Sequence, residues 1–242
     1  MEYVKNLLVY VRPEKKFVGE HEVLARVQID NAISLGQKEN IILATNFDYE
    51  YNGVKSIVVS DENYCAVRPR SIKTSIIPYL IERRIIEEGK IYWNHDFDAY
   101  QVNLMTEEEL GLGGLDAGFT TYGWKNRWCL GSDFIKSSAK DIFEWLRDSI
   151  YTNLEDETVL GKITKGNTHN INSRIKKMNI TYQIGMRNVE YNYGIADKPI
   201  KVLHFHPSKK GLLDIFMYGK NKMGIPLMSD RLIEVFKYYG IK

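Results

Sequence analysis

The sequence predicts an α/β fold with a mostly parallel central sheet flanked by helices. The first observation behind this is the order of patterns over the first 102 residues, which reads strand, helix, strand, strand, helix, strand. The second is that the runs at residues 6–11 and 40–47 are mainly apolar, as is typical of strands buried on both faces. The third is the absence of an internal repeat, a low-complexity tract or a clear linker, so we expect a single domain over residues 1–242.

Four strands and two helices are expected in the first part of the chain. The strands are predicted at residues 6–11, 40–47, 54–61 and 90–102. The first helix is predicted at residues 21–36, because apolar residues recur near helical spacing up to a terminal glycine. The second is predicted at residues 71–89, where Pro78 should kink the helix or mark a boundary.

The second part of the chain is less regular. Residues 110–128 are rich in glycine and aromatic residues, which indicates loops with short strands. Helices are predicted at residues 137–154, from residue 155 onwards and at the end of the chain, residues 229–242. A late strand is expected within residues 200–211, ending in a basic loop.

Composition restricts the class of protein more than its activity. The 242 residues are 44% hydrophobic and 26% charged, with a net charge of +2, so nothing demands a nucleic-acid or membrane partner. Two cysteines imply no disulfide framework, and a reducing compartment is the simpler interpretation. The N-terminus lacks a signal pattern and the apolar runs are too short to cross a bilayer. We therefore expect a cytoplasmic protein with no stable membrane insertion.

Two acids stand at the end of the strand predicted at residues 90–102. Asp96 and Asp98 are two positions apart, and side chains at this spacing on a strand face the same way. Paired carboxylates repel unless a cation lies between them, and oxygen ligands suit Mg²⁺ or Mn²⁺. The alternative is a pair of solvated acids, which is about as probable when the motif is considered alone.

A second group of polar residues follows the late strand. His204 and His206 share one face, and Lys209 and Lys210 come directly after them. Imidazole is a common metal ligand, and lysine is suited to phosphate. One buried histidine before a basic turn would also explain this pattern. Together with the acids, however, the stretch supplies both halves of a metal–diphosphate site.

In the order of these features the chain resembles the GT-A-fold glycosyltransferases, closest to the glycogenin-like and lipopolysaccharide galactosyltransferase-like group. The resemblance covers roughly residues 6–211. It implies a metal site made of Asp96, Asp98 and His204. It also implies that the cationic residues contact the diphosphate of a nucleotide sugar. These residues are Arg70 or Lys73 before the two acids, and Lys209 or Lys210 after the late histidine.

The same resemblance implies candidate sugar contacts. The segment "LDAGFTTY" is similar to the family's Asn-Ala-Gly segment and places Asp116 there. The segment "EDETVLGKI" is similar to the family's Asp-Gln pair and places Asp156 and Glu157 there. An inverting enzyme would use one of these acids as general base, whereas a retaining enzyme could use none, and the sequence does not choose.

The nucleotide is expected at the end of the first strand. Ligands of open α/β sheets bind beyond the carboxyl ends of the strands, so Tyr10, Val11 and Arg12 should lie against the base and ribose. The resemblance implies Mn²⁺ or Mg²⁺ as the metal and favours a UDP-sugar as donor. The acceptor stays open between a sugar, a protein, a lipid-sugar and a modified nucleobase.

Some residues depart from the family's pattern. Polar Asn94 and His95 stand before the acids where apolar residues are expected. Pro207 replaces a glycine after the late histidine, and Glu157 replaces the glutamine. Two other functions therefore stay open: a metal-dependent phosphohydrolase or nuclease, and a sugar- or nucleic-acid-binding module that has lost catalysis. The first would act without an acceptor, and the second would bind without metal and without turnover.

Overall fold

A computed structural model of the protein describes residues 2–123, 127–185, 189–204, 218–220, 224, 226 and 228–238. Within these residues no helix has both the length and the apolar character needed to cross a bilayer. The predictions for Lys209, Lys210 and His206 lie outside the described residues.

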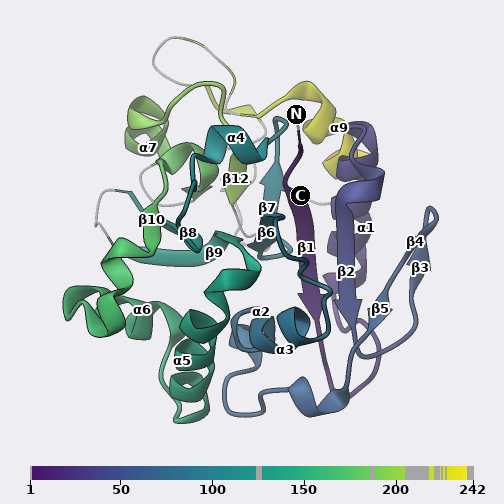
Figure 1. Cartoon of the computed structure of the whole chain (residues 1–242). Coiled ribbons are helices and arrows are strands. Elements are labelled where there is room, and N and C mark those ends of the chain that lie inside the picture. The colour runs from purple at the N-terminus through teal and green to yellow at the C-terminus, as the bar shows by residue number, and fades with distance from the viewer. Residues whose placement is uncertain are drawn as a thin grey trace.

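A seven-stranded sheet forms the centre of the molecule (Figure 1). Its order is β10-β8-β9-β6-β1-β2-β5. Strand β6 runs parallel to β1, β1 to β2 and β2 to β5, whereas β9 is antiparallel to both β6 and β8. The prediction of a mostly parallel sheet is therefore confirmed. The strands are β1 (Lys5–Tyr10), β2 (Ile41–Thr45), β5 (Ile57–Val58), β6 (Tyr92–His95), β8 (Ala117–Thr121), β9 (Trp128–Ile135) and β10 (Ile175–Lys177).

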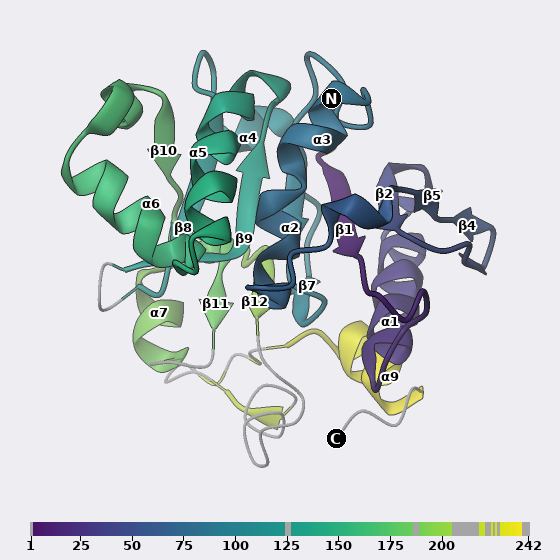
Figure 2. The same ribbon diagram turned by 90° about the horizontal axis from the view of Figure 1, so that it is seen from below.

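One face of this sheet is covered by a helical layer, which Figure 2 shows in front of the strands. Leu7 and Val9 of β1 point into this layer, and they are fully or almost fully buried there. The helix predicted at residues 71–89 is found as two short helices that end at Glu82, earlier than predicted, with Pro78 in the first turn of the second. The helices of this layer are α2 (Ile72–Ser75), α3 (Ile77–Glu82), α5 (Lys140–Tyr151) and α6 (Asp156–Lys165).

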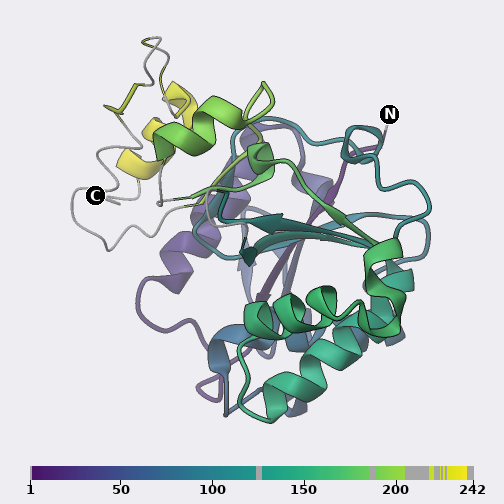
Figure 3. The ribbon, with the colours of Figure 1, turned by 90° about the vertical axis from the view of Figure 1, so that its left-hand side faces the viewer.

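The opposite face packs against a second layer, so the sheet lies between the two, as Figure 3 shows. Leu8 and Tyr10 alternate with the residues above and point into this layer. Strands β11, β12 and β7 form a small separate sheet there. The elements on this side are α1 (His21–Ser34), β7 (Ala99–Gln101), β11 (Ile184–Gly185), α7 (Val189–Ile195), β12 (Val202–His204) and α9 (Asp230–Tyr238).

The remaining elements are short. A hairpin joins β3 (Glu50–Tyr51) and β4 (Val54–Lys55), and α4 covers Glu107–Leu110. The third predicted strand, residues 54–61, is found as two pieces, β4 and β5, in different sheets. Short 3₁₀ segments occur at Lys38–Asn40, Asp61–Asn63, Pro69–Ser71, Ser137–Ala139, Thr168–Ser173 and Ile180–Tyr182, and the segment Thr168–Ser173 is kinked.

The strand predicted at residues 90–102 also divides in two, and this division builds the site. β6 belongs to the large sheet and β7 to the small one. Between them the amide of Asp96 donates to the carbonyl of Gly131 at 3.1 Å, and the amide of Ala99 donates back to Asp96 at 3.0 Å. The two acids therefore lie in a turn between two sheets. The expectation of one continuous strand is wrong because the chain leaves the large sheet at this turn.

Candidate metal and nucleotide site

The turn between β6 and β7 meets the end of β12. β12 is antiparallel to β7, and its register places His204 opposite Ala99. The imidazole Nε2 lies 3.1 Å from Asp98 Oδ1 and 3.5 Å from Asp96 Oδ2. One ligand atom from each of the three residues lies within 4.8 Å of the other two. The structure thus brings together the three residues that the sequence predicts as a metal site.

The chemistry of this group fits a divalent cation. Two carboxylates and one imidazole nitrogen are ligands that Mn²⁺ and Mg²⁺ accept in proteins. Burial lowers the pKa of His204, but the carboxylates of Asp98 and Asp96 outweigh burial and raise this pKa well above its ordinary value. The group therefore attracts positive charge, which a bound metal ion would supply in place of a proton.

Lys73 of α2 is the fixed cation beside this group. Its ammonium lies 2.5 Å from Asp96 Oδ1 and also donates to the backbone carbonyl of Leu130. The side chain is buried, which lowers its pKa, but Asp96 and Asp133 raise this pKa by more. Lys73 thus stays charged next to Asp96, on the side of the helical layer.

Gly131 of β9 is a site residue that the sequence analysis missed. A Cβ atom added to it would lie 2.2 Å from His204 Cε1 and 3.0 Å from Asp96 Oδ2. Only glycine therefore leaves room for the imidazole beside the strand. A glycine inside an apolar run, as in "WCLGSDFI", often marks such a close approach, so the signal was present.

Asp133 of β9 was also missed. It is fully buried, and Asn94 Nδ2 lies 3.2 Å from each of its carboxylate oxygens. Burial raises the pKa of Asp133 to about 8, although Lys73 and Asn94 act in the opposite direction. The polar residue at position 94 thus has a partner across the strands.

His95, the other polar residue at a position where the family has an apolar one, is a packing residue. Its Nε2 lies 2.6 Å from Asn6 Oδ1 and its Nδ1 2.8 Å from the carbonyl of Asp96. Its ring stacks on Trp93 with 3.5 Å between centroids. Burial lowers its pKa to about 3, so the ring is neutral. Its contacts hold the end of β6, where the turn that carries Asp96 and Asp98 begins.

Two of the predicted sugar-contact residues lie in the first turn of α6, on the side of Lys73. Asp156 Oδ2 accepts a hydrogen bond of 3.1 Å from the hydroxyl of Thr74, the residue after Lys73. Glu157 Oε1 accepts from the hydroxyl of Tyr122 at 2.8 Å. Burial raises the pKa of Glu157. The structure thus places both acids at the start of α6, beside the helix α2 that carries Lys73.

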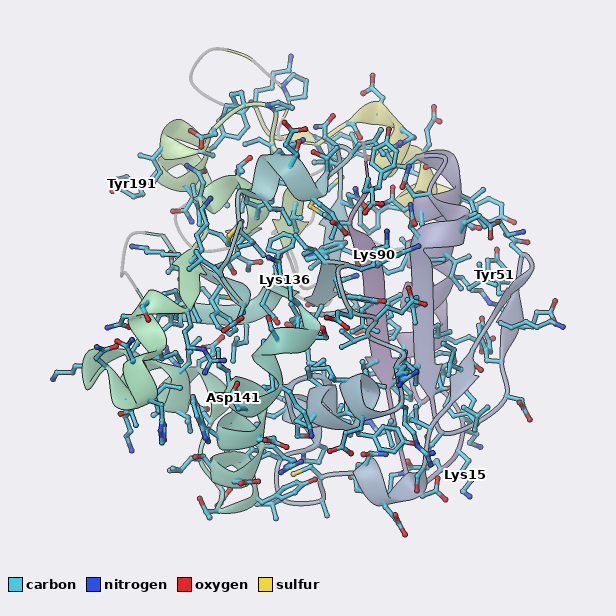
Figure 4. All side chains as sticks on the ribbon, viewed as in Figure 1. Lys15, Tyr51, Lys90, Lys136, Asp141 and Tyr191 are labelled. Carbon is cyan, nitrogen blue, oxygen red and sulfur yellow. The ribbon has the colours of Figure 1, made fainter. Side chains whose placement is uncertain are left out.

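Asp116 lies elsewhere. Ala117, the next residue, is level with Ile135 and thus with Tyr92, at the start of β6 rather than at its end. The Asp116 carboxylate is 2.6 Å from Arg174 Nε, in an ion pair. Asp141, labelled in Figure 4 on α5, binds the same guanidinium. The expected grouping of Asp116 with the other acids is not found, because β8 runs antiparallel to β9 and begins at the far edge of the sheet.

The predicted nucleotide residues lie at the carboxyl end of β1. Asn46 Oδ1 accepts from the Arg12 amide at 3.0 Å, and Asn46 Nδ2 donates to the Arg12 carbonyl at 2.7 Å. Val11 is fully buried, and the Tyr10 hydroxyl accepts from the Val18 amide at 3.0 Å. β1 and β6 are parallel, so these residues lie at the same edge of the large sheet as the turn that carries Asp96 and Asp98.

Arg70 is exposed, in the 3₁₀ turn directly before α2. It stands three positions before Lys73 in the chain, and the two cations belong to neighbouring turns. Among the described residues, Lys73 is thus a buried cation of the site, and the exposed Arg70 lies near it in the chain.

The order and direction of the strands, together with the turn at the end of β6, are those of the GT-A fold. Solved structures agree. The galactosyltransferase LgtC in complex with donor and acceptor sugar analogs has a TM-score of 0.58 and 13% identity, over 97% of this chain and 96% of that one. An active-site mutant of LgtC has a TM-score of 0.56 and 14% identity, over the same shares.

A third similar structure is a glycosyltransferase involved in the glycosylation of the major capsid of PBCV-1. Its TM-score is 0.52 at 12% identity, over 83% of this chain and 93% of that one. No family model and no curated protein sequence matches the chain. These likenesses establish that the chain has the GT-A fold.

Proposed function

We propose that the protein is a metal-dependent glycosyltransferase that moves a sugar from a nucleotide-diphosphate sugar to an acceptor. The observation that carries this proposal is the convergence of Asp96, Asp98 and His204 at the carboxyl edge of a GT-A sheet. The similar structures named above support it, since each is described as a glycosyltransferase.

The three ligands would hold Mn²⁺ or Mg²⁺. When bound, the cation offsets the negative charge that develops on the departing diphosphate. Lys73 serves the same purpose from the protein side, because its ammonium is held within the site by Asp96 and Leu130. We assign Arg70, Lys209 and Lys210 to the outer phosphate oxygens, as the resemblance implies.

The donor is a UDP-sugar in this proposal. The nucleoside would lie against Tyr10, Val11 and Arg12. The backbone of Arg12 is held in place by two hydrogen bonds with Asn46, which would keep this surface fixed for the nucleoside. Asp156 and Glu157 would contact sugar hydroxyls from the start of α6, on the same side as Lys73. Asp116 is the weakest of the proposed sugar contacts, because its carboxylate is paired with Arg174.

The acceptor is a sugar, a protein, a lipid-sugar or a modified nucleobase. The LgtC structure is described with an acceptor sugar analog, and the PBCV-1 enzyme acts in the glycosylation of a capsid. These descriptions support a sugar or protein acceptor first.

Thermal unfolding tests the central claim. Mn²⁺ and UDP together should raise the melting temperature by more than the sum of their separate effects, because each completes the binding site of the other. Asp98→Ala should remove this synergy. Asp148→Ala, a change of an exposed acid on α5, is the control and should keep it. If wild-type protein shows no synergy with any nucleotide diphosphate, the proposal fails.

Product analysis separates the open alternatives. A glycosyltransferase should consume the sugar nucleotide and release the nucleoside diphosphate faster when the acceptor is present. Acceptor-independent cleavage of phosphoesters would indicate the phosphohydrolase or nuclease instead. Metal-independent binding without turnover would indicate the binding module.

A further inference from the structure

Gln183 contacts the proposed metal ligand His204 from behind. It directly precedes β11, which runs parallel to β12, and its side chain is 1% exposed. Its Nε2 lies 2.5 Å from His204 Nδ1, the ring nitrogen that faces away from the acids. On the other side of the ring, Gly131 leaves only the space that the imidazole fills. The ring is therefore confined, and Gln183 is its polar neighbour at Nδ1.

The orientation of this amide decides which ring nitrogen carries the proton. While Nε2 of Gln183 donates to Nδ1, the imidazole must be neutral and carry its hydrogen on its own Nε2, whereas the charged ring carries a hydrogen on each nitrogen and cannot accept there. That hydrogen points at Asp98 Oδ1, 3.1 Å away. A metal ion at the two acids needs a free lone pair at this same nitrogen. The proton must then be on Nδ1, and Nδ1–H requires an acceptor.

The hydrogen-bond acceptor is the oxygen of the same Gln183 amide. Gln183 Oε1 is buried and has no hydrogen-bond partner among the described residues. Turning the amide by 180° would place this oxygen at Nδ1 without breaking any hydrogen bond that the oxygen now makes. The other neighbour of the amide, Cys129 Sγ at 3.2 Å from Nε2, can donate as well as accept, so it tolerates both orientations.

We propose that Gln183 is a positioning residue that accepts a hydrogen bond from His204 Nδ1 when a divalent cation binds, and so directs the lone pair of Nε2 to the metal. This inference rests on the proposed function, because it assumes that the three ligands hold a cation. It adds a fourth residue to the site, and Gln183 acts on the metal only through His204.

Three variants test this role by Mn²⁺ binding alone, measured by electron paramagnetic resonance of free Mn²⁺. Gln183→Leu keeps the approximate shape but offers no acceptor, and it should weaken Mn²⁺ binding about 10- to 100-fold. Gln183→Glu offers only acceptor oxygens and should keep the affinity within about threefold of wild type or tighten it. Gln37→Leu, which changes another buried glutamine that contacts Asn40, is the matched control and should bind as wild type does.

The outcomes separate the two proposals. If wild-type protein does not bind Mn²⁺, the metal site itself is wrong. If wild type binds but Gln183→Leu binds equally well, the positioning role is overturned. If Gln183→Glu loses as much affinity as Gln183→Leu, the amide does not act as an acceptor and the inference fails. Should Gln183→Leu not fold, the comparison of Gln183→Glu with wild type still decides, because a required amide donor would make the glutamate variant weak.

Discussion

Gly131 shows how one missing side chain can be part of a site. Gly131→Ala would put a Cβ 2.2 Å from His204 Cε1, so the imidazole has to move away from the two acids. We expect Mn²⁺ affinity to fall about tenfold or more, as when an outer partner of a metal ligand is lost. Titration with Mn²⁺ measures this.

A second glycine provides the control. Gly161 lies inside α6, and a Cβ added there meets nothing within 4 Å. Gly161→Ala should leave Mn²⁺ affinity unchanged and stabilise the fold by about 0.5–1 kcal/mol, because alanine favours a helix. Equal affinities for the two alanine variants would show that His204 does not need the space at Gly131.

Asp133 should make stability depend on pH in a predictable direction. Its pKa is about 8 in the folded chain and has an ordinary value of 3.8, so between these values the folded state keeps a proton that the unfolded state releases. The contribution of this group to stability therefore falls as pH rises from about 4 to 8. Asp133→Asn removes the dependence, so its melting temperature relative to wild type should be higher at pH 8 than at pH 5. A constant difference across this range would contradict the burial argument.

At the scale of elements, patterns predicted whole helices well and divided strands poorly. The helices at α1, α5, α6 and α9 follow from apolar spacing and terminal signals, and they are confirmed. β6 and β7 are both buried, and apolar residues recur on both sides of the two acids, so the pattern at residues 90–102 gives no sign that the chain changes sheets. The turn depends on tertiary contacts that the sequence does not show, such as the hydrogen bond from the Asp96 amide to the Gly131 carbonyl.

The same scale explains the position of Asp116. Arg174, just before β10, binds Asp116 before β8 and Asp141 on α5, so this cluster ties three elements together at the far edge of the sheet. Asp116→Asn should therefore lower the melting temperature, by about 2–4 °C for each kcal/mol lost, and leave Mn²⁺ affinity unchanged. A loss of metal or UDP binding with unchanged stability would instead favour the role that the sequence resemblance implies for Asp116.

At the scale of the whole molecule, the residues with ligand chemistry were predictable and those that arrange them were not. Asp96, Asp98 and His204 have side chains of types that commonly bind metal ions, so their order in the sequence was sufficient to predict that they lie together. Gln183 has an ordinary side chain, and its role depends on the pairing of β11 with β12, which one sequence does not reveal.

The turn at residues 96–98 is where the chain passes from the large sheet to the small one, and His204 belongs to the small sheet. A cation bound by both Asp96 and His204 would link the two sheets at that junction. Filling the site should slow amide hydrogen exchange in β7 and β12 more than in β1 or β2. Metal occupancy would then control how rigidly the small sheet is held against the large one, in addition to the net charge of the site.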